Sequence, residues 1–235
     1  MAATTDTGVD RSGQLASKLN WLRAGVLGAN DGIVSVAGIV MGVVGATTDT
    51  QALLIAGLAG LVAGALSMAG GEYVSVSTQK DTEIAAVARV ERTLHDDPAA
   101  ALKDLAEVYE AQGIDPALAR QVAQQLTAQD SLNAQTKVRL GIAADETTSP
   151  WHAAFASLIA FTAGGLVPFL AMGLPPAWRI GATVAAVEVA LVLTGTVSAR
   201  LGGAHAANAA LRNVVVGTAT MALAHAVGRL VGVAI

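Results

Sequence analysis

Long apolar stretches without charge constrain the fold of this 235-residue chain more than any other feature. Residues 50–71, 147–178 and 213–228 contain no Asp, Glu, Lys or Arg, and residues 22–45 contain only Arg23 and Asp31. About 20 such residues cross a bilayer as a helix. Hydrophobic residues make up 53% of the chain and charged residues 14%, which is too apolar for a soluble domain. The sequence therefore predicts an all-α polytopic membrane protein embedded in a lipid bilayer.

Five transmembrane helices are expected, at 22–46, 52–79, 151–174, 177–200 and 211–234. The resulting organisation is an N-terminal segment (1–21), helices one and two (22–79), a polar insert (80–149) and helices three to five (150–235). The insert is expected to be helical, because Asp97-Pro98 and Asp115-Pro116 are helix-start signals. No break follows the second transmembrane helix before Arg92, so that helix should continue into the insert.

The distribution of basic residues predicts the orientation in the membrane. With five spans, all of the 14 Lys and Arg residues except Arg179 and Arg229 fall on the side of the N-terminus and the insert. The N-terminus and insert are therefore expected in the cytoplasm, with the C-terminus outside. Short loops and an alanine-rich composition favour a bacterial plasma membrane. Trp21, Trp151 and Trp178 fall at predicted span ends, where interfacial tryptophans are common.

Asp31 is the polar residue that points most directly to a function. It lies about eight residues, or about 12 Å of helix, inside the first span. A carboxylate at that depth is costly unless it faces a partner, a cavity or an ion. Counting residues from the span ends predicts Met68 and Glu188 at a similar depth, with Glu72 about one turn closer to the cytosol. Carboxylate and thioether ligands suit iron(II) or manganese(II) better than magnesium or calcium, so these four residues are candidate metal ligands.

Each candidate also has a purely structural interpretation. Asp31 could make a buried hydrogen bond that fixes helix packing, and Glu72 could be an interfacial carboxylate. Met68 could be ordinary apolar filler. Glu188 could pair with a cation or a neighbouring helix, and His225 is more typical of a helix contact than of a ligand.

Several other function classes are disfavoured by what the sequence lacks. The chain has no cysteine, which excludes disulfides, thiolate metal sites and cysteine nucleophiles. Its net charge of −4 and the absence of a basic cluster argue against nucleic acid as a partner. No Ser/His or His/His pair has the spacing of a nucleophile or a metal hydrolase within one helix. Neither an enzyme nor a permanently bound cofactor is therefore expected.

Two long motifs resemble the vacuolar iron transporter family: LNWLRAGVLGANDGIVSVAGIVMGV at 19–43 and LAGLVAGALSMAGGEYVSVSTQKDTE at 58–83. The resemblance implies a homodimer of five-helix subunits, with the ion path between the subunits and a cytoplasmic insert that collects metal. It also implies proton-coupled export of iron(II), and in some members manganese(II), from the cytosol. Asp31 and Met68 match the membrane metal residues of that family. Glu72 lies in the shared GEYVS motif, and its assignment as a ligand rests on depth alone.

The insert departs from the family pattern at its expected metal-collecting positions. Family members commonly carry glutamates at the positions occupied here by Val90, Thr93, Ala101 and Asp104, and near Arg139. Of these positions only Asp104 keeps a carboxylate, which makes it the one metal candidate in the insert. Weak metal binding by the insert is therefore expected.

The resulting expectation is a transporter that moves iron(II) or manganese(II) out of the cytosol by proton exchange. The alternative is a membrane-anchored sensor or scaffold whose insert binds a partner and which moves no ion. The lost insert carboxylates give this alternative some support.

Overall fold

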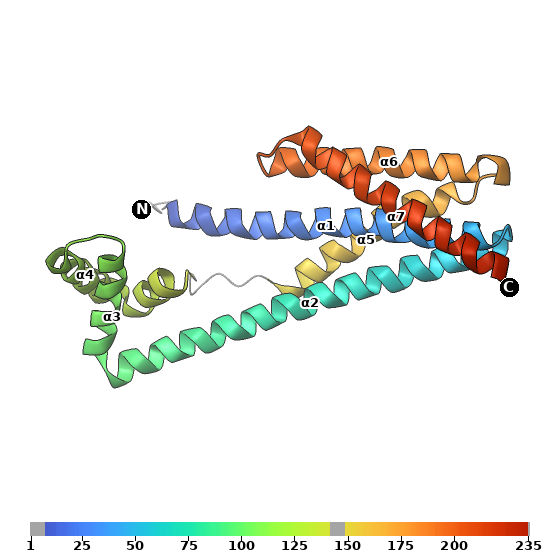
Figure 1. Ribbon diagram of the computed structural model, residues 1–235. Coiled ribbons are helices and arrows are strands. Elements are labelled where there is room, and N and C mark those ends of the chain that lie inside the picture. Colours follow the sequence, from blue (N-terminus) through green and yellow to red (C-terminus); the bar gives the residue numbers. More distant parts are fainter. Residues whose placement is uncertain (1–7, 142–148, 235) are drawn as a thin grey trace, which may run out of the picture. The chain divides into compact units, whose positions relative to one another are not determined.

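The computed structural model describes residues 8–141 and 149–234, and all regular elements in those ranges are helices (Figure 1). Five of them contain a stretch long and apolar enough to cross a membrane: α1 (Gly8–Ala46), α2 (Thr50–Asp96), α5 (Pro150–Ala171), α6 (Pro176–Leu201) and α7 (Ala206–Ala234). The predicted all-α class with five transmembrane helices is confirmed. The first seven residues of the N-terminal segment, residues 142–148 of the insert and the C-terminal Ile235 lie outside the described residues.

The helix boundaries follow the start signals that the sequence carries. Helices α3 (Pro98–Ala111) and α4 (Pro116–Gln135) each begin at a proline that follows an aspartate. The side chains of Asp97 and Asp115 each accept a backbone N–H of the first helical turn at 2.9 Å. Such caps satisfy backbone donors that have no partner inside the helix. The long second helix is also confirmed, since α2 runs without a break into the insert.

The chain divides into two compact units. The membrane unit comprises Lys18–Tyr73 and Pro150–Ile235, and therefore holds α1 from Lys18 onward, the first part of α2, and α5 to α7. The insert unit comprises Met1–Ser17 and Val74–Ser149, and holds the start of α1, the rest of α2, α3, α4 and the π-helix η1 (Thr136–Leu140). The division falls inside α2, a few residues before the boundary that the sequence predicted.

The insert unit is held together by packing between α3 and α4. Its small core contains Leu105, Ala106 and Ala123, with Tyr109 packed against them. Helical periodicity in the sequence predicts an apolar stripe of Leu102, Leu105, Ala106 and Tyr109 on α3, and the core confirms it. The same periodicity predicts a stripe of Leu118, Val122 and Leu126 on α4, but Leu118 is 53% exposed while Ala119 and Ala123 are fully buried. Small alanine side chains allow two helices to approach closely. The buried face of α4 therefore contains Ala119 and Ala123, each one residue after a member of the predicted stripe.

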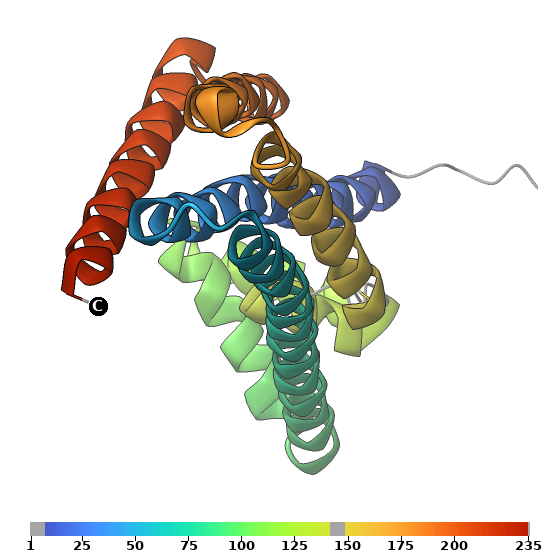
Figure 2. The same cartoon turned by 90° about the vertical axis from the view of Figure 1, so that its right-hand side faces the viewer.

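Helix α1 is the central element of the membrane unit. It supplies a row of buried residues to the main core: Ile33, Val36, Ala37, Val40 and Met41. Helices α5 and α7 cross α1 at different points along its length (Figure 2). A Cβ at Gly32 would overlap the carbonyl oxygen of Phe161 in α5, and a Cβ at Gly228 in α7 would overlap that of Gly42. The glycines are therefore where the helices approach most closely, as small residues allow in membrane proteins.

A buried arginine connects two turns at one end of the membrane unit. Arg179 in α6 is only 4% exposed. Its Nε donates to the carbonyl oxygen of Leu174 at 3.3 Å, and its Nη2 donates to Thr50 Oγ1 at 3.1 Å. These bonds tie the α5–α6 turn to the first residue of α2. The start of α2 is thereby held in register with the α5–α6 hairpin.

Candidate metal site

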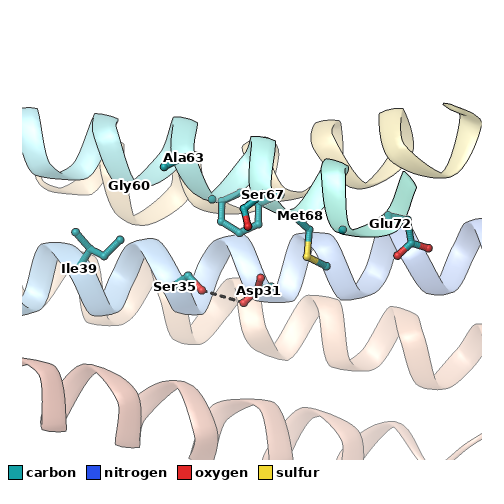
Figure 3. Close-up of a pocket in the computed structure, with 11 residues that line it drawn as sticks. Asp31, Ser35, Ile39, Gly60, Ala63, Ser67, Met68 and Glu72 are labelled. Atoms are coloured by element: carbon teal, nitrogen blue, oxygen red, sulfur yellow. Dashed lines mark hydrogen bonds between the residues drawn. The ribbon is translucent and has the colours of Figure 1, made fainter. Parts of the chain in front are cut away.

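A pocket of about 550 Å³ lies between α1 and α2 in the membrane unit, with Phe161 of α5 also on its wall. It brings together three of the residues that the sequence singled out, Asp31, Met68 and Glu72 (Figure 3). The other lining residues are small or apolar, or carry a hydroxyl group: Ser35, Ile39, Gly60, Ala63, Gly64, Ser67, Gly71 and Phe161. These three residues, which the sequence compared only by depth, therefore line one pocket between two helices.

Two glycines of α2 let large side chains of α1 and α5 form the apolar wall of the pocket. A Cβ at Gly60 would lie 2.5 Å from the Cδ1 atom of Ile39, and a Cβ at Gly64 would overlap the ring of Phe161. Large side chains of α1 and α5 therefore fill the space that these two glycines leave. One turn further along α2, the polar end of the pocket begins at Met68.

The pocket holds two carboxylates and one thioether. Asp31 is half-buried and accepts a hydrogen bond from Ser35 Oγ to its Oδ1 at 2.9 Å. Figure 3 shows the Met68 sulfur on the side of α2 that faces α1, with Glu72 one turn beyond it. Within the described ranges, no Lys, Arg or His pairs with either carboxylate. Since none of the described side chains neutralises these two carboxylates, their oxygens can take part in binding a cation.

The remaining sequence candidates lie elsewhere. Glu188 on α6 does not line the pocket, and its Oε1 accepts a hydrogen bond from the Thr218 hydroxyl of α7. Its Oε2 is buried and finds no partner in the part of the chain that the structure describes. Asp104 lies on α3 in the insert unit. The Nδ1 atom of His225 is 3.2 Å from the Met41 carbonyl oxygen, so this histidine contacts α1 as its structural interpretation predicted.

Sequence reasoning did not select Ser35 or Ser67, which both line the pocket. Ser35 could have been found, because it follows Asp31 by four residues and so lies next to it on one helix face. Among the described residues, no three His, Cys, Asp or Glu side chains gather closely enough to hold a metal ion. An ion in the pocket therefore needs further ligands beyond the two carboxylates, such as the thioether, a hydroxyl group, water or a second copy of the chain.

Comparison with known proteins identifies the family. Residues 22–229 match the model of the VIT family. This chain belongs to the VIT family. The match extends from the start of the first apolar stretch into α7, and so includes every residue of the pocket.

Relatives of this VIT family member support the assignment over nearly the whole chain. The vacuolar iron transporter of Acanthamoeba castellanii is 42% identical over 212 residues, covering 89% of this chain and 78% of that protein. Vacuolar iron transporter homolog 2 of Oryza sativa subsp. japonica is 38% identical, covering 91% and 92%. Vacuolar iron transporter homolog 4 of Arabidopsis thaliana is 36% identical, covering 92% and 87%. The resemblance to the vacuolar iron transporter family is confirmed.

Proposed function

We propose that this protein transports a divalent metal ion, iron(II) or manganese(II), out of the cytosol in exchange for protons. The pocket formed by Asp31, Met68 and Glu72 inside an apolar five-helix unit is the observation that carries this proposal. The names of the relatives support the choice of iron as cargo. The ion is a substrate in transit and not a resident cofactor, and no chemical conversion is involved.

The ligand chemistry accounts for both the ion and the proton coupling. Oxygen ligands with one soft thioether favour borderline divalent ions over magnesium or calcium. Carboxylates bind a metal only when they are deprotonated, so protonation of Asp31 or Glu72 on the far side releases the ion. Each transport cycle then returns protons in the opposite direction to the metal.

A homodimer completes the coordination of the ion. One chain supplies Asp31, Met68 and Glu72, which is fewer ligands than the six oxygens typical of an octahedral divalent ion. A second copy facing the first would supply the same three groups again. This arrangement agrees with an ion path between two subunits, which the family resemblance implies.

The insert contributes little metal binding in this proposal. Val90 and Ala101 are buried at 9% and 1% exposure, so these positions serve packing in the insert unit. Asp104 is the only carboxylate at an expected metal-collecting position. Among the described residues, the membrane pocket is then the place where we expect strong metal binding.

Flux measurements on the full chain in proteoliposomes test this function. We expect accumulation of iron(II) and manganese(II), faster when the receiving side is acidic, and little accumulation of magnesium or calcium. Flux that does not respond to the pH gradient would contradict proton exchange. If no divalent ion accumulates at all, transport is wrong and the sensor or scaffold is the better interpretation.

The orientation is also a proposal, with the insert in the cytoplasm and the α5–α6 turn outside. The relatives are named for the vacuole, whereas the sequence favoured a bacterial plasma membrane. In both membranes an exporter moves the ion away from the cytosol, so the direction is the same.

Single cysteines test the orientation cleanly, because the chain has none of its own. Ala111 in the insert, Ala177 at the start of α6 and Ala204 after α6 are all exposed. We expect an impermeant thiol reagent to label Ala177→Cys from outside the cell. Ala111→Cys and Ala204→Cys should react only after the membrane is opened. Labelling of all three from one side would contradict five spans.

A further inference from the structure

The hydroxyl of Ser35 donates to a carboxylate, as that of Thr218 does, whereas three other threonines of the membrane unit bond the helix backbone. Thr162, Thr183 and Thr220 in the membrane unit each donate to the carbonyl oxygen four residues earlier. This back-bonding is the usual fate of a hydroxyl inside a helix. Ser35 instead donates to the side chain of Asp31, at 2.9 Å, inside the pocket. Its hydroxyl proton is therefore committed to the carboxylate and not to the helix backbone.

We propose that Ser35 is a positioning residue that makes Asp31 a single-oxygen ligand and thereby selects against large cations. The inference rests on the proposed transport function of the pocket. With Oδ1 engaged by Ser35, Asp31 presents Oδ2 to an ion. Calcium, at about 2.3–2.6 Å from its oxygens, commonly binds both oxygens of one carboxylate. Iron(II) is smaller and softer than calcium, so one Asp31 oxygen together with the Met68 thioether and further ligands can hold it.

The bond also has a role when no ion is present. Ile39 and Phe161 are apolar parts of the pocket lining, and apolar walls do not solvate a carboxylate. The Ser35 hydroxyl replaces part of the lost water. Because donor and acceptor lie on the same helix, the bond persists when α1 and α2 move relative to each other. Asp31 therefore keeps one orientation through a transport cycle.

Ser35→Ala removes the donor, and the main readout is calcium inhibition of iron(II) uptake into proteoliposomes. Calcium should inhibit the variant at a concentration about five-fold or more below that for the wild type, because both Asp31 oxygens become free. Iron(II) uptake by the variant is measured in the same vesicles, so that the readout is the ratio between calcium inhibition and iron(II) affinity and does not depend on the absolute rate. Ser35→Thr keeps a hydroxyl at the same position and should restore the wild-type selectivity. A merely structural serine would not change the ratio between two ions.

Ser157→Ala is the matched control. Its hydroxyl is buried in α5, lies outside the pocket, and has no hydrogen-bond partner within the described part of the chain. Its loss should leave the selectivity unchanged. If Ser35→Ala does not fold, Ser35→Cys replaces it, because a thiol is a much weaker donor of similar size.

The outcomes separate this inference from the proposed function. Unchanged calcium sensitivity in folded Ser35→Ala or Ser35→Cys, with transport abolished in Asp31→Asn, would overturn the role of Ser35 and leave transport intact. Wild-type flux in Asp31→Asn would instead contradict the proposed function itself. A shift in calcium sensitivity that Ser35→Thr reproduces would also contradict the inference, because threonine keeps the donor.

Discussion

Replacing Asp31 with asparagine is expected to abolish metal flux while the protein stays folded. The two side chains have nearly the same volume, and the asparagine carbonyl oxygen can still accept the hydrogen bond from Ser35. The negative charge and one strong ligand are lost. Substitutions of outer-shell groups already cost about 10–100-fold in metal affinity, so loss of a direct ligand should reduce flux by at least about 100-fold. The measurement is initial iron(II) uptake into proteoliposomes, with size-exclusion chromatography to check folding.

Asp49→Asn is a matched control for this experiment. Asp49 is exposed in the turn between α1 and α2, and its Oδ1 accepts the backbone N–H of Gln51 at 2.9 Å. Asparagine can cap α2 in the same way, so both folding and flux should be unchanged. A folded Asp31→Asn protein with wild-type flux would reduce Asp31 to a residue that serves helix packing.

Much of the pocket could be predicted because depth along straight membrane helices is simple to count. Each residue adds about 1.5 Å, so Asp31, Met68 and Glu72 could be compared before their positions were known. The caps at Asp97 and Asp115 were equally readable, because aspartate followed by proline is a local signal. A helix cap depends only on neighbouring residues of one helix, and depth depends only on the number of residues from the end of a span. Both can be obtained from the sequence without knowing how the helices pack.

Features that depend on the direction a side chain faces could not be predicted in the same way. The depth count predicted Glu188 at the level of Asp31, but depth does not say which way a side chain faces, and Glu188 bonds Thr218 of α7 and does not line the pocket. Leu118 was expected in the core of the insert, where Ala119 is buried instead. In both cases the neighbouring helix decides which face is covered. Which face is buried depends on where the backbones of two helices approach closely. The periodicity of apolar residues within one helix does not contain that information.

Close contact between α1 and α5 leads to the second large effect, which is the loss of stability expected for Gly32→Ala. Gly32 is buried where α1 crosses α5. A Cβ there would overlap the Phe161 carbonyl oxygen and lie 2.9 Å from the backbone nitrogen of Gly165. Both are backbone atoms, which cannot rotate away as a side chain can. The two helices must therefore separate to admit a single methyl group.

Separation of α1 and α5 should cost about 2–4 kcal/mol, at the upper end of overpacking effects, because the strain falls on helix backbones. For a chain of this size that corresponds to a fall of about 4–16 °C in the midpoint of thermal unfolding, measured in detergent. Flux should also decrease, because Gly32 is next to Asp31 in α1 and Phe161 lines the pocket. Gly25→Ala makes the same change on the same helix where nothing lies within 4 Å, so it should leave both unfolding midpoint and flux unchanged. Equal midpoints for the two variants would mean that α1 and α5 do not approach closely at Gly32, and the wall that Phe161 provides for the pocket would have to lie elsewhere.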